Sequence, residues 1–124
     1  MARRSLLALK LSGQICLTEP LMTVLVVLFN LKAGVKRDDY EAWARAVDLP
    51  TVNGLASVDR FRVLQCQSVL GSEAPPPYQY VEILDLHSLP ALFDDIGTPL
   101  MQKVASEFQA FAEAPVFIVT ESLT

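Results

Sequence analysis

The stretch Met22-Thr-Val-Leu-Val-Val-Leu-Phe-Asn-Leu-Lys32 is apolar at almost every position and is typical of a β-strand. Because the side chains of a strand alternate between two faces, a strand that is apolar on both faces must be covered on both. Two helices of the same chain can cover one face of its sheet, whereas the other face needs a second sheet. We expect a second copy of the chain to supply that sheet, with a hydrophobic chamber between the two sheets.

A helix is expected after this strand, because apolar residues then recur at i, i+3, i+4 and i+7. These residues are Tyr40, Trp43, Ala44 and Val47. The same pattern leaves Asp48 free to face water. Leu49-Pro50 is expected to end the helix, since a proline disfavours helical geometry in the residue before it.

The remaining segments complete the order strand, helix, strand, strand, helix, strand. Strands are expected within 57–70 and 78–86, joined by a stiff loop that contains three successive prolines, and a last strand over 116–120. Ser88 and Thr98 can each cap a helical segment that opens with a proline, and Pro115 ends the second segment. This βαββαβ order predicts a ferredoxin-like α+β fold, in which two helices cover one face of a four-stranded antiparallel sheet and leave the other face bare. Two such sheets packed through their bare faces give a dimeric α+β barrel.

The composition limits which partners the protein can bind. The chain has 124 residues, which suffices for one domain, and its hydrophobic content of 52% is high for a small monomer and favours a homodimer. A net charge of -4 argues against nucleic acid, which would require clustered Lys and Arg.

The first part of the chain differs from the rest. We place the domain at residues 22–124 and expect residues 1–21 to form an N-terminal extension that is poorly ordered or loosely packed. The extension starts with Arg3-Arg4 and an apolar run, but Lys10 and Gln14 interrupt that run, so neither a secretory signal nor a membrane span is expected. The two cysteines, Cys16 and Cys66, do not make a disulfide framework, which fits the cytoplasm.

Several blocks of the chain resemble, in order, the REDY-like (HapK-type) protein family. These blocks are Asn30-Leu-Lys-Ala-Gly-Val35, Tyr40-Glu-Ala-Trp-Ala-Arg45, Asp48-Leu-Pro-Thr-Val52, Ser57-Val-Asp59 and Tyr78-Gln-Tyr-Val-Glu82. The resemblance covers about Met22 to Leu123 and implies a small cytoplasmic protein with the dimeric α+β barrel fold and no metal or organic cofactor. It also implies a role in secondary-metabolite biosynthesis, around prodigiosin-type and bisindole pigments, with flat aromatic intermediates as ligands.

Two residues are candidates for proton transfer. Glu82 lies in the middle of an apolar strand, where an acid faces a cavity, with a raised pKa, or faces solvent on an edge strand, or is paired with Arg60 or Arg62 across the hairpin. His87 is the single histidine, although a lone imidazole at a strand end is more often a surface residue. Without a second histidine or a cysteine nearby, no metal site is expected.

Six residues are candidates for substrate binding: Asn30, Tyr40, Trp43, Tyr80, Met101 and Phe108. Tyr80 shares a strand face with Glu82 by the two-residue period. The aromatic pair of the first helix, Tyr40 and Trp43, either packs in the core or floors a ligand cavity. Asn30 either contacts a ligand carbonyl or satisfies its turn.

Three functions follow as hypotheses. The first is a cofactor-independent enzyme, or enzyme helper, that holds an aromatic intermediate and promotes cyclisation, condensation or dehydration by positioning and proton transfer. The second is a non-catalytic binding or carrier protein of the same fold. The third, a cofactor-free monooxygenase, rests on fold analogy alone.

Overall fold

The structure, a computed structural model, describes residues 9–10, 16–17 and 22–124. Most of the expected N-terminal extension, 1–21, lies outside these described residues. Its described parts pair as two short antiparallel strands, β1 (Leu9–Lys10) and β2 (Cys16–Leu17).

A four-stranded antiparallel sheet forms the centre of the domain. Its strands lie in the order β4 (Val58–Gln65), β5 (Tyr80–Leu86), β3 (Thr23–Leu31) and β6 (Ala112–Glu121). Each neighbouring pair is antiparallel, and β3 is an inner strand. With the helices between the strands, this arrangement confirms the predicted ferredoxin-like βαββαβ fold.

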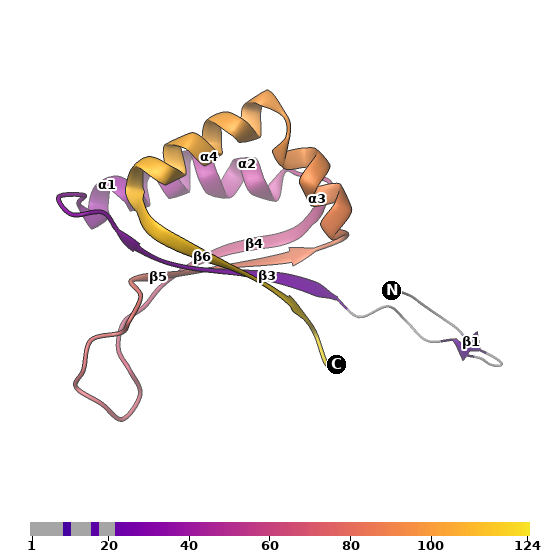
Figure 1. The fold of residues 1–124 in the computed structure, drawn as a ribbon, viewed down its shortest axis with the longest axis horizontal. Helices are drawn as coiled ribbons and strands as arrows, with labels where there is room; N and C mark the ends of the chain where they lie inside the picture. Colours follow the sequence, from indigo (N-terminus) through magenta and orange to yellow (C-terminus); the bar gives the residue numbers. More distant parts are fainter. Residues whose placement is uncertain (1–8, 11–15, 18–21) are drawn as a thin grey trace.

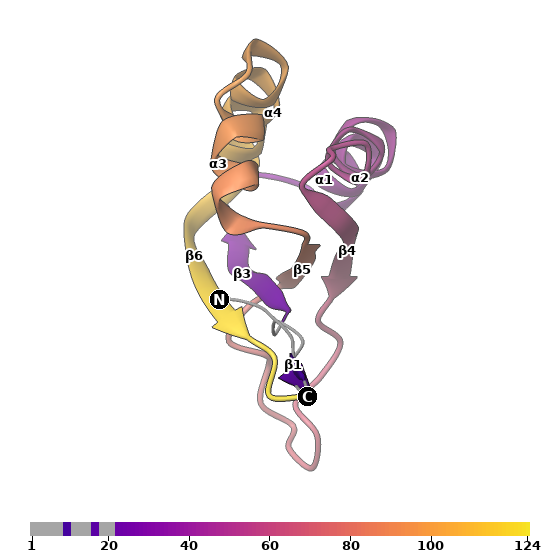
Figure 2. The same cartoon turned by 90° about the vertical axis from the view of Figure 1, so that its right-hand side faces the viewer.

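All the helices lie on one side of the sheet (Figure 1). They are α1 (Arg37–Trp43), α2 (Leu49–Asn53), α3 (Leu89–Ile96) and α4 (Pro99–Phe111). Figure 2 shows α1 and α2 above β4, and α3 and α4 above β6. The predicted caps are confirmed: Ser88 Oγ accepts from the Ala91 N–H at 3.2 Å, and Thr98 Oγ1 accepts from the Met101 N–H at 3.4 Å.

The first helix continues past Pro50, so the prediction that Leu49-Pro50 ends it is wrong. A π-helical turn, Ala44–Asp48, joins α1 to α2, and the Leu49 N–H donates to the Ala44 carbonyl. Pro50 then lies in the first turn of α2, where a residue without an N–H is tolerated.

The π-turn also overturns the expectation that Asp48 faces water. A π-turn closes hydrogen bonds five residues apart rather than four, so it holds more residues per turn than an α-helix. The residues that follow are therefore rotated back toward the face that carries Tyr40 and Ala44. Asp48 is buried, with 5% of its surface exposed.

Strand β6 begins at Ala112, four residues before the predicted start at Val116, and includes Pro115. Its pairing with β3 shifts between Leu28 and Asn30, and Ala114 has a φ of 45°. A proline cannot donate to the ladder, but an edge strand with a bulge tolerates one.

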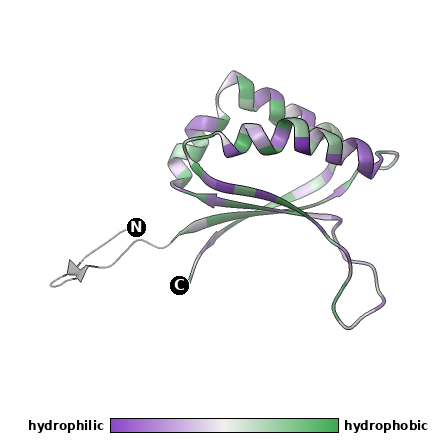
Figure 3. Cartoon of the chain, turned by 180° about the vertical axis from the view of Figure 1, so that it is seen from behind, coloured by the Kyte–Doolittle hydropathy of each residue, from purple (hydrophilic) through white to green (hydrophobic). Residues whose placement is uncertain are grey.

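The strands alternate between a covered and an uncovered face. On β5, Tyr80, Glu82, Leu84 and Leu86 are buried under the helices, while the residues between them are half-buried on the bare face. Hydrophobic residues occur along all the strands of this sheet, as the colouring of Figure 3 shows. The bare face carries Val26 and Leu28 beside Ile118 and Val116.

Candidate functional site

An apolar cavity of about 440 Å³ lies between the sheet and its helices. Side chains from every layer line it, among them Leu25, Leu84, Leu92, Met101, Val104 and Phe108. The chamber between two sheets that we expect from the sequence is a different place, and it stays a prediction. The cavity found here lies on the opposite, helix-covered face of one sheet, within a single chain.

Only two ionisable side chains are among the residues that line this cavity, Asp48 and Glu82. Asp48 comes from the end of the π-turn, and Glu82 comes from the middle of β5. Glu82 is 6% exposed. The predicted alternative, an ion pair with Arg60 or Arg62, is not formed, because both arginines alternate onto the other face of the sheet.

Burial raises the pKa values of both carboxyl groups. Desolvation raises the pKa of Asp48 to about 7. Desolvation, and then the negative charge of Asp48, raises the pKa of Glu82 well above its usual value, while the nearby Tyr40 hydroxyl partly offsets this effect. Burial therefore favours the neutral acid form of Glu82, while a pKa of about 7 lets Asp48 exchange between its acid and carboxylate forms near neutral pH.

Tyr40 lies directly beside this pair. Its side chain is fully buried, and burial together with the charge of Glu82 raises the pKa of its hydroxyl, so the phenol stays protonated. Within the described part of the chain, neither Tyr40 Oη nor Glu82 Oε2 has a hydrogen-bond partner of good geometry. Buried polar atoms are nearly always paired in native proteins, so two unpaired ones beside a cavity indicate a place for a ligand group or a water molecule.

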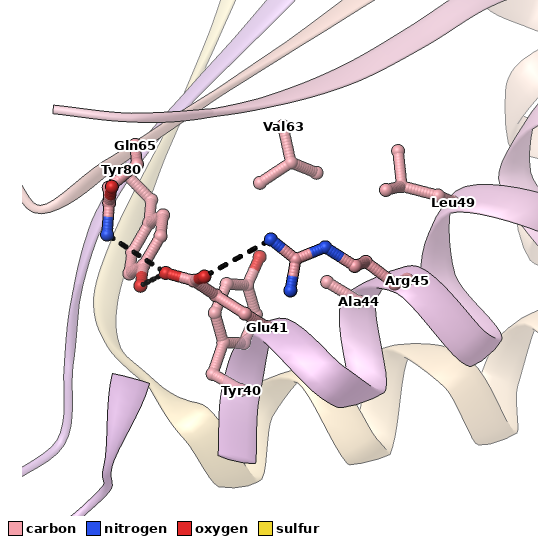
Figure 4. Close-up of a pocket in the computed structure, with 8 residues that line it drawn as sticks. All are labelled: Tyr40, Glu41, Ala44, Arg45, Leu49, Val63, Gln65 and Tyr80. Carbon is pink, nitrogen blue, oxygen red and sulfur yellow. Dashed lines mark hydrogen bonds and ion pairs between the residues drawn. The ribbon is translucent and has the colours of Figure 1, made fainter. Parts of the chain in front are cut away.

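A second, smaller pocket of about 120 Å³ lies on the outer side of Tyr40 (Figure 4). Here Glu41 accepts hydrogen bonds from Tyr80 Oη at 2.6 Å and from Gln65 Nε2 at 3.0 Å, and it pairs with Arg45 at 3.4 Å. The Glu41 carboxylate therefore has three partners in this outer pocket, whereas the Tyr40 hydroxyl, whose residue also lines the pocket, has none of good geometry among the described residues.

The structure brings three of the predicted site residues into the lining of the large cavity: Glu82, Met101 and Phe108. Tyr40 lies beside Glu82, but it lines the outer pocket, as Tyr80 does, and not the large cavity. These positions are consistent with a shared site but do not test the roles of the residues.

Three other candidates lie outside the residues that line the two pockets. Asn30 hydrogen-bonds Pro77 O and the Gln79 N–H, which satisfies the turn, and Trp43 Nε1 donates to Glu107 Oε1 at 2.8 Å. His87 is exposed at the end of β5. The structure therefore gives no support to His87 as a partner of Glu82.

Asp48 is the residue that sequence reasoning missed. Pro50, two positions later, was the signal in the sequence that could have revealed it. A proline inside a helical pattern indicates that the helix is locally irregular, and an irregular turn changes which residues face the core. π-Helical turns of this kind occur frequently at functional sites.

No three His, Cys, Asp or Glu side chains gather into a group suited to a metal ion among residues 9–10, 16–17 and 22–124. In the same described ranges, no helix combines the length and the apolar character needed to cross a bilayer.

These features define a ferredoxin-like α+β protein with an apolar cavity under its helices and two buried carboxyl groups in the wall of that cavity. The family described as REDY-like protein HapK matches residues 23–123. The chain belongs to this family, which confirms the resemblance found in the sequence.

Solved structures agree with this assignment. The crystal structure of HapK from Hahella chejuensis is 28% identical, with a TM-score of 0.68 over 82% of this chain and 93% of that one. A hydroxynitrile lyase from Passiflora edulis (12% identity, TM-score 0.69, 83% of this chain and 95% of that one) shares the fold. So does a protein of unknown function from Thermobifida fusca, described as dimeric and ferredoxin-like (16% identity, TM-score 0.62, 82% and 92%). No curated protein sequence matches the chain significantly.

Proposed function

We propose that this protein binds an apolar aromatic small molecule in the cavity between its sheet and helices and catalyses a proton transfer in that molecule without a cofactor. The observation that carries the proposal is the pair of buried carboxyl groups, Asp48 and Glu82, in the wall of an otherwise apolar cavity. A cavity of about 440 Å³ is within the usual range for small-molecule sites, about 300–1,000 Å³.

The two carboxyl groups have different roles in this proposal. Asp48, with a pKa of about 7, is the base that removes a proton from the bound molecule. Glu82, whose raised pKa favours the neutral form, is the acid that donates a proton to a developing oxyanion or leaving group. Two neighbouring carboxyl groups whose surroundings give them different pKa values are a recurrent arrangement for acid–base chemistry.

This acid–base pair fits cyclisation, condensation or dehydration of an aromatic intermediate. Membership of the REDY-like family supports a place in secondary-metabolite biosynthesis, around the pigment pathways that the sequence resemblance implies. The hydroxynitrile lyase among the structural neighbours is an enzyme on the same fold, and at 12% identity it supports only the capacity of the fold to carry a catalytic site.

We also propose that the protein is a homodimer in the cytoplasm. Four successive apolar residues of the edge strand β6 are 40–58% exposed: Val116, Phe117, Ile118 and Val119. A second copy packed against the bare sheet face would cover Val116 and Ile118. Light scattering should give twice the mass of one chain, and Ile118→Glu should shift the mass toward one chain; a wild-type monomer at micromolar concentration would contradict the proposal.

The catalytic role can be tested without the natural substrate. 5-Nitrobenzisoxazole is a flat aromatic probe whose C–H proton is removed by a base while its N–O bond breaks, giving a coloured phenolate. We expect the protein to accelerate this reaction, with a rate that rises with pH around a midpoint near 7 as Asp48 ionises. Asp48→Asn should lower the rate by about 100-fold or more.

Two controls separate catalysis from simple binding. Glu41→Gln changes a carboxylate of the outer pocket and should leave the rate unchanged. Glu82→Gln should bind the probe as tightly as the wild type but form the phenolate more slowly. Binding of the probe without acceleration would instead favour the carrier hypothesis, and an unchanged rate in Asp48→Asn would exclude Asp48 as the base.

A further inference from the structure

The side chains that line the large cavity include acidic groups but no basic ones. Apart from Asp48 and Glu82, its polar side chains are Gln102 and Gln109 of α4, both of which are exposed. No Lys, Arg or His is among the lining residues. The inner part of the cavity therefore has two carboxyl groups and no cation to balance them.

Three arginines of the elements that flank the cavity are held elsewhere. Arg45 pairs with Glu41 in the outer pocket, and Arg60 and Arg62 alternate onto the bare face of the sheet. A negative charge on Asp48 is therefore poorly compensated by the described residues. In a poorly solvated site, such a charge attracts a cation and repels an anion more strongly than it would in water.

An unfilled hydrogen-bonding position lies at the same place. Glu82 Oε2 is buried and has no partner in the described part of the chain, although its residue lines the cavity. A ligand group with more than one N–H could donate to Asp48 and to Glu82 together. A carboxylate or phosphate ligand would offer only acceptors to the Asp48 carboxylate.

We propose that the ligand of this cavity is an aromatic molecule that carries a basic nitrogen, an amine or an imine, bound as its cation with its N–H groups toward Asp48 and Glu82. The ring system lies against the apolar walls formed by Leu25, Leu84 and Phe108. This inference rests on the proposed function for the location of the site, and it adds the charge class of the ligand.

Three matched probes test the charge class, because they share one ring system and differ in one head group. 2-Naphthylmethylamine is a cation, 2-naphthalenemethanol is neutral and 2-naphthoate is an anion at pH 8. By titration calorimetry, we expect the amine to bind at least 10-fold more tightly than the alcohol and the naphthoate to bind most weakly. In Asp48→Asn, the preference for the amine over the alcohol should fall to less than 3-fold, whereas Glu41→Gln should keep it.

The outcomes separate this inference from the proposed function. If the alcohol or the naphthoate binds the wild-type protein as tightly as the amine, or if the preference survives in Asp48→Asn, the charge class is wrong and the cavity remains a binding site. Ala105 is exposed and lines the cavity, so Ala105→Trp should obstruct the site with little effect on folding. If none of the probes binds the wild type, or Ala105→Trp leaves binding unchanged, the proposed function fails as well.

Discussion

Carboxyl groups lie on both sides of the Tyr40 side chain, but those on one side are paired and those on the other are desolvated. On the outer side, the Glu41 carboxylate has three partners, Tyr80, Gln65 and Arg45. On the inner side, the Glu82 and Asp48 carboxyl groups face an apolar cavity, and Glu82 Oε2 has no partner in the described chain. The partners of the outer carboxylate stabilise the fold, whereas burying the inner pair lowers the free energy of unfolding. Buried carboxyl groups that lower stability are typical of a functional site.

The largest expected difference is in the pH dependence of stability. The folded-state pKa of Asp48 is raised from 3.8 to about 7, so between these values the folded state binds a proton that the unfolded state has lost. The contribution of Asp48 to the free energy of unfolding should therefore fall with rising pH across this window, by up to about 1.4 kcal/mol per pH unit, and level off above it.

Asp48→Asn isolates this contribution, because it removes the titrating group and retains the shape of the side chain. Urea unfolding of both proteins at several pH values measures it. The wild type should be the less stable of the two at pH 8, with the difference disappearing toward pH 4. A constant difference across this range would show that the Asp48 carboxyl is not desolvated.

Replacing Glu82 should have the next largest effect. Glu82→Met exchanges a buried, unpaired carboxyl group for an apolar side chain of similar length, and should raise the free energy of unfolding by about 1–3 kcal/mol. The same variant should lose proton-transfer activity. A loss of stability in thermal or urea unfolding would mean that Glu82 has a structural partner.

The outer carboxylate should respond in the opposite direction. Glu41→Ala leaves the Tyr80 hydroxyl without its 2.6 Å acceptor and should lower the free energy of unfolding by about 1–3 kcal/mol. Tyr80→Phe in the Glu41→Ala background provides the control, because it removes the orphaned hydroxyl and should recover part of the loss. Equal stability of wild type and Glu41→Ala would remove the contrast between the two pockets.

The smallest effect is expected at the surface of the outer pocket. The Arg45 side chain is 73% exposed, and its pair with Glu41 joins residues four apart on one helix. Arg45→Ala should therefore change the free energy of unfolding by no more than about 0.5 kcal/mol. A larger loss in urea unfolding would show that Arg45 is needed to hold Glu41 in place.

The fold was predictable because its determinants are local. The apolar run over β3 and the caps Ser88 and Thr98 each fix an element from a few neighbouring residues, and the βαββαβ order follows from them. Glu82 could be singled out for the same reason, since an acid in an apolar strand is visible in the sequence, but alternation along β5 does not by itself tell which face the helices cover.

The rest of the site was less predictable, because it depends on how elements meet. Tyr80 and Glu82 share a strand face but line different pockets, since the Tyr40 side chain lies between them. Asp48 was misplaced because the helical periodicity assumed a regular α-helix. His87 attracted attention as a chemically capable residue, yet capability alone does not indicate which way a side chain points.

The π-turn at Ala44–Asp48 has a consequence for comparing members of this family. A π-turn is equivalent to one residue inserted into an α-helix, so deleting a single residue there would restore an ordinary helix and keep the acidic side chain at its end on the face that carries Tyr40 and Ala44. Homologues with and without the extra residue can therefore present an acid to the same cavity, and an alignment must allow a one-residue gap in this helix to match the two acids.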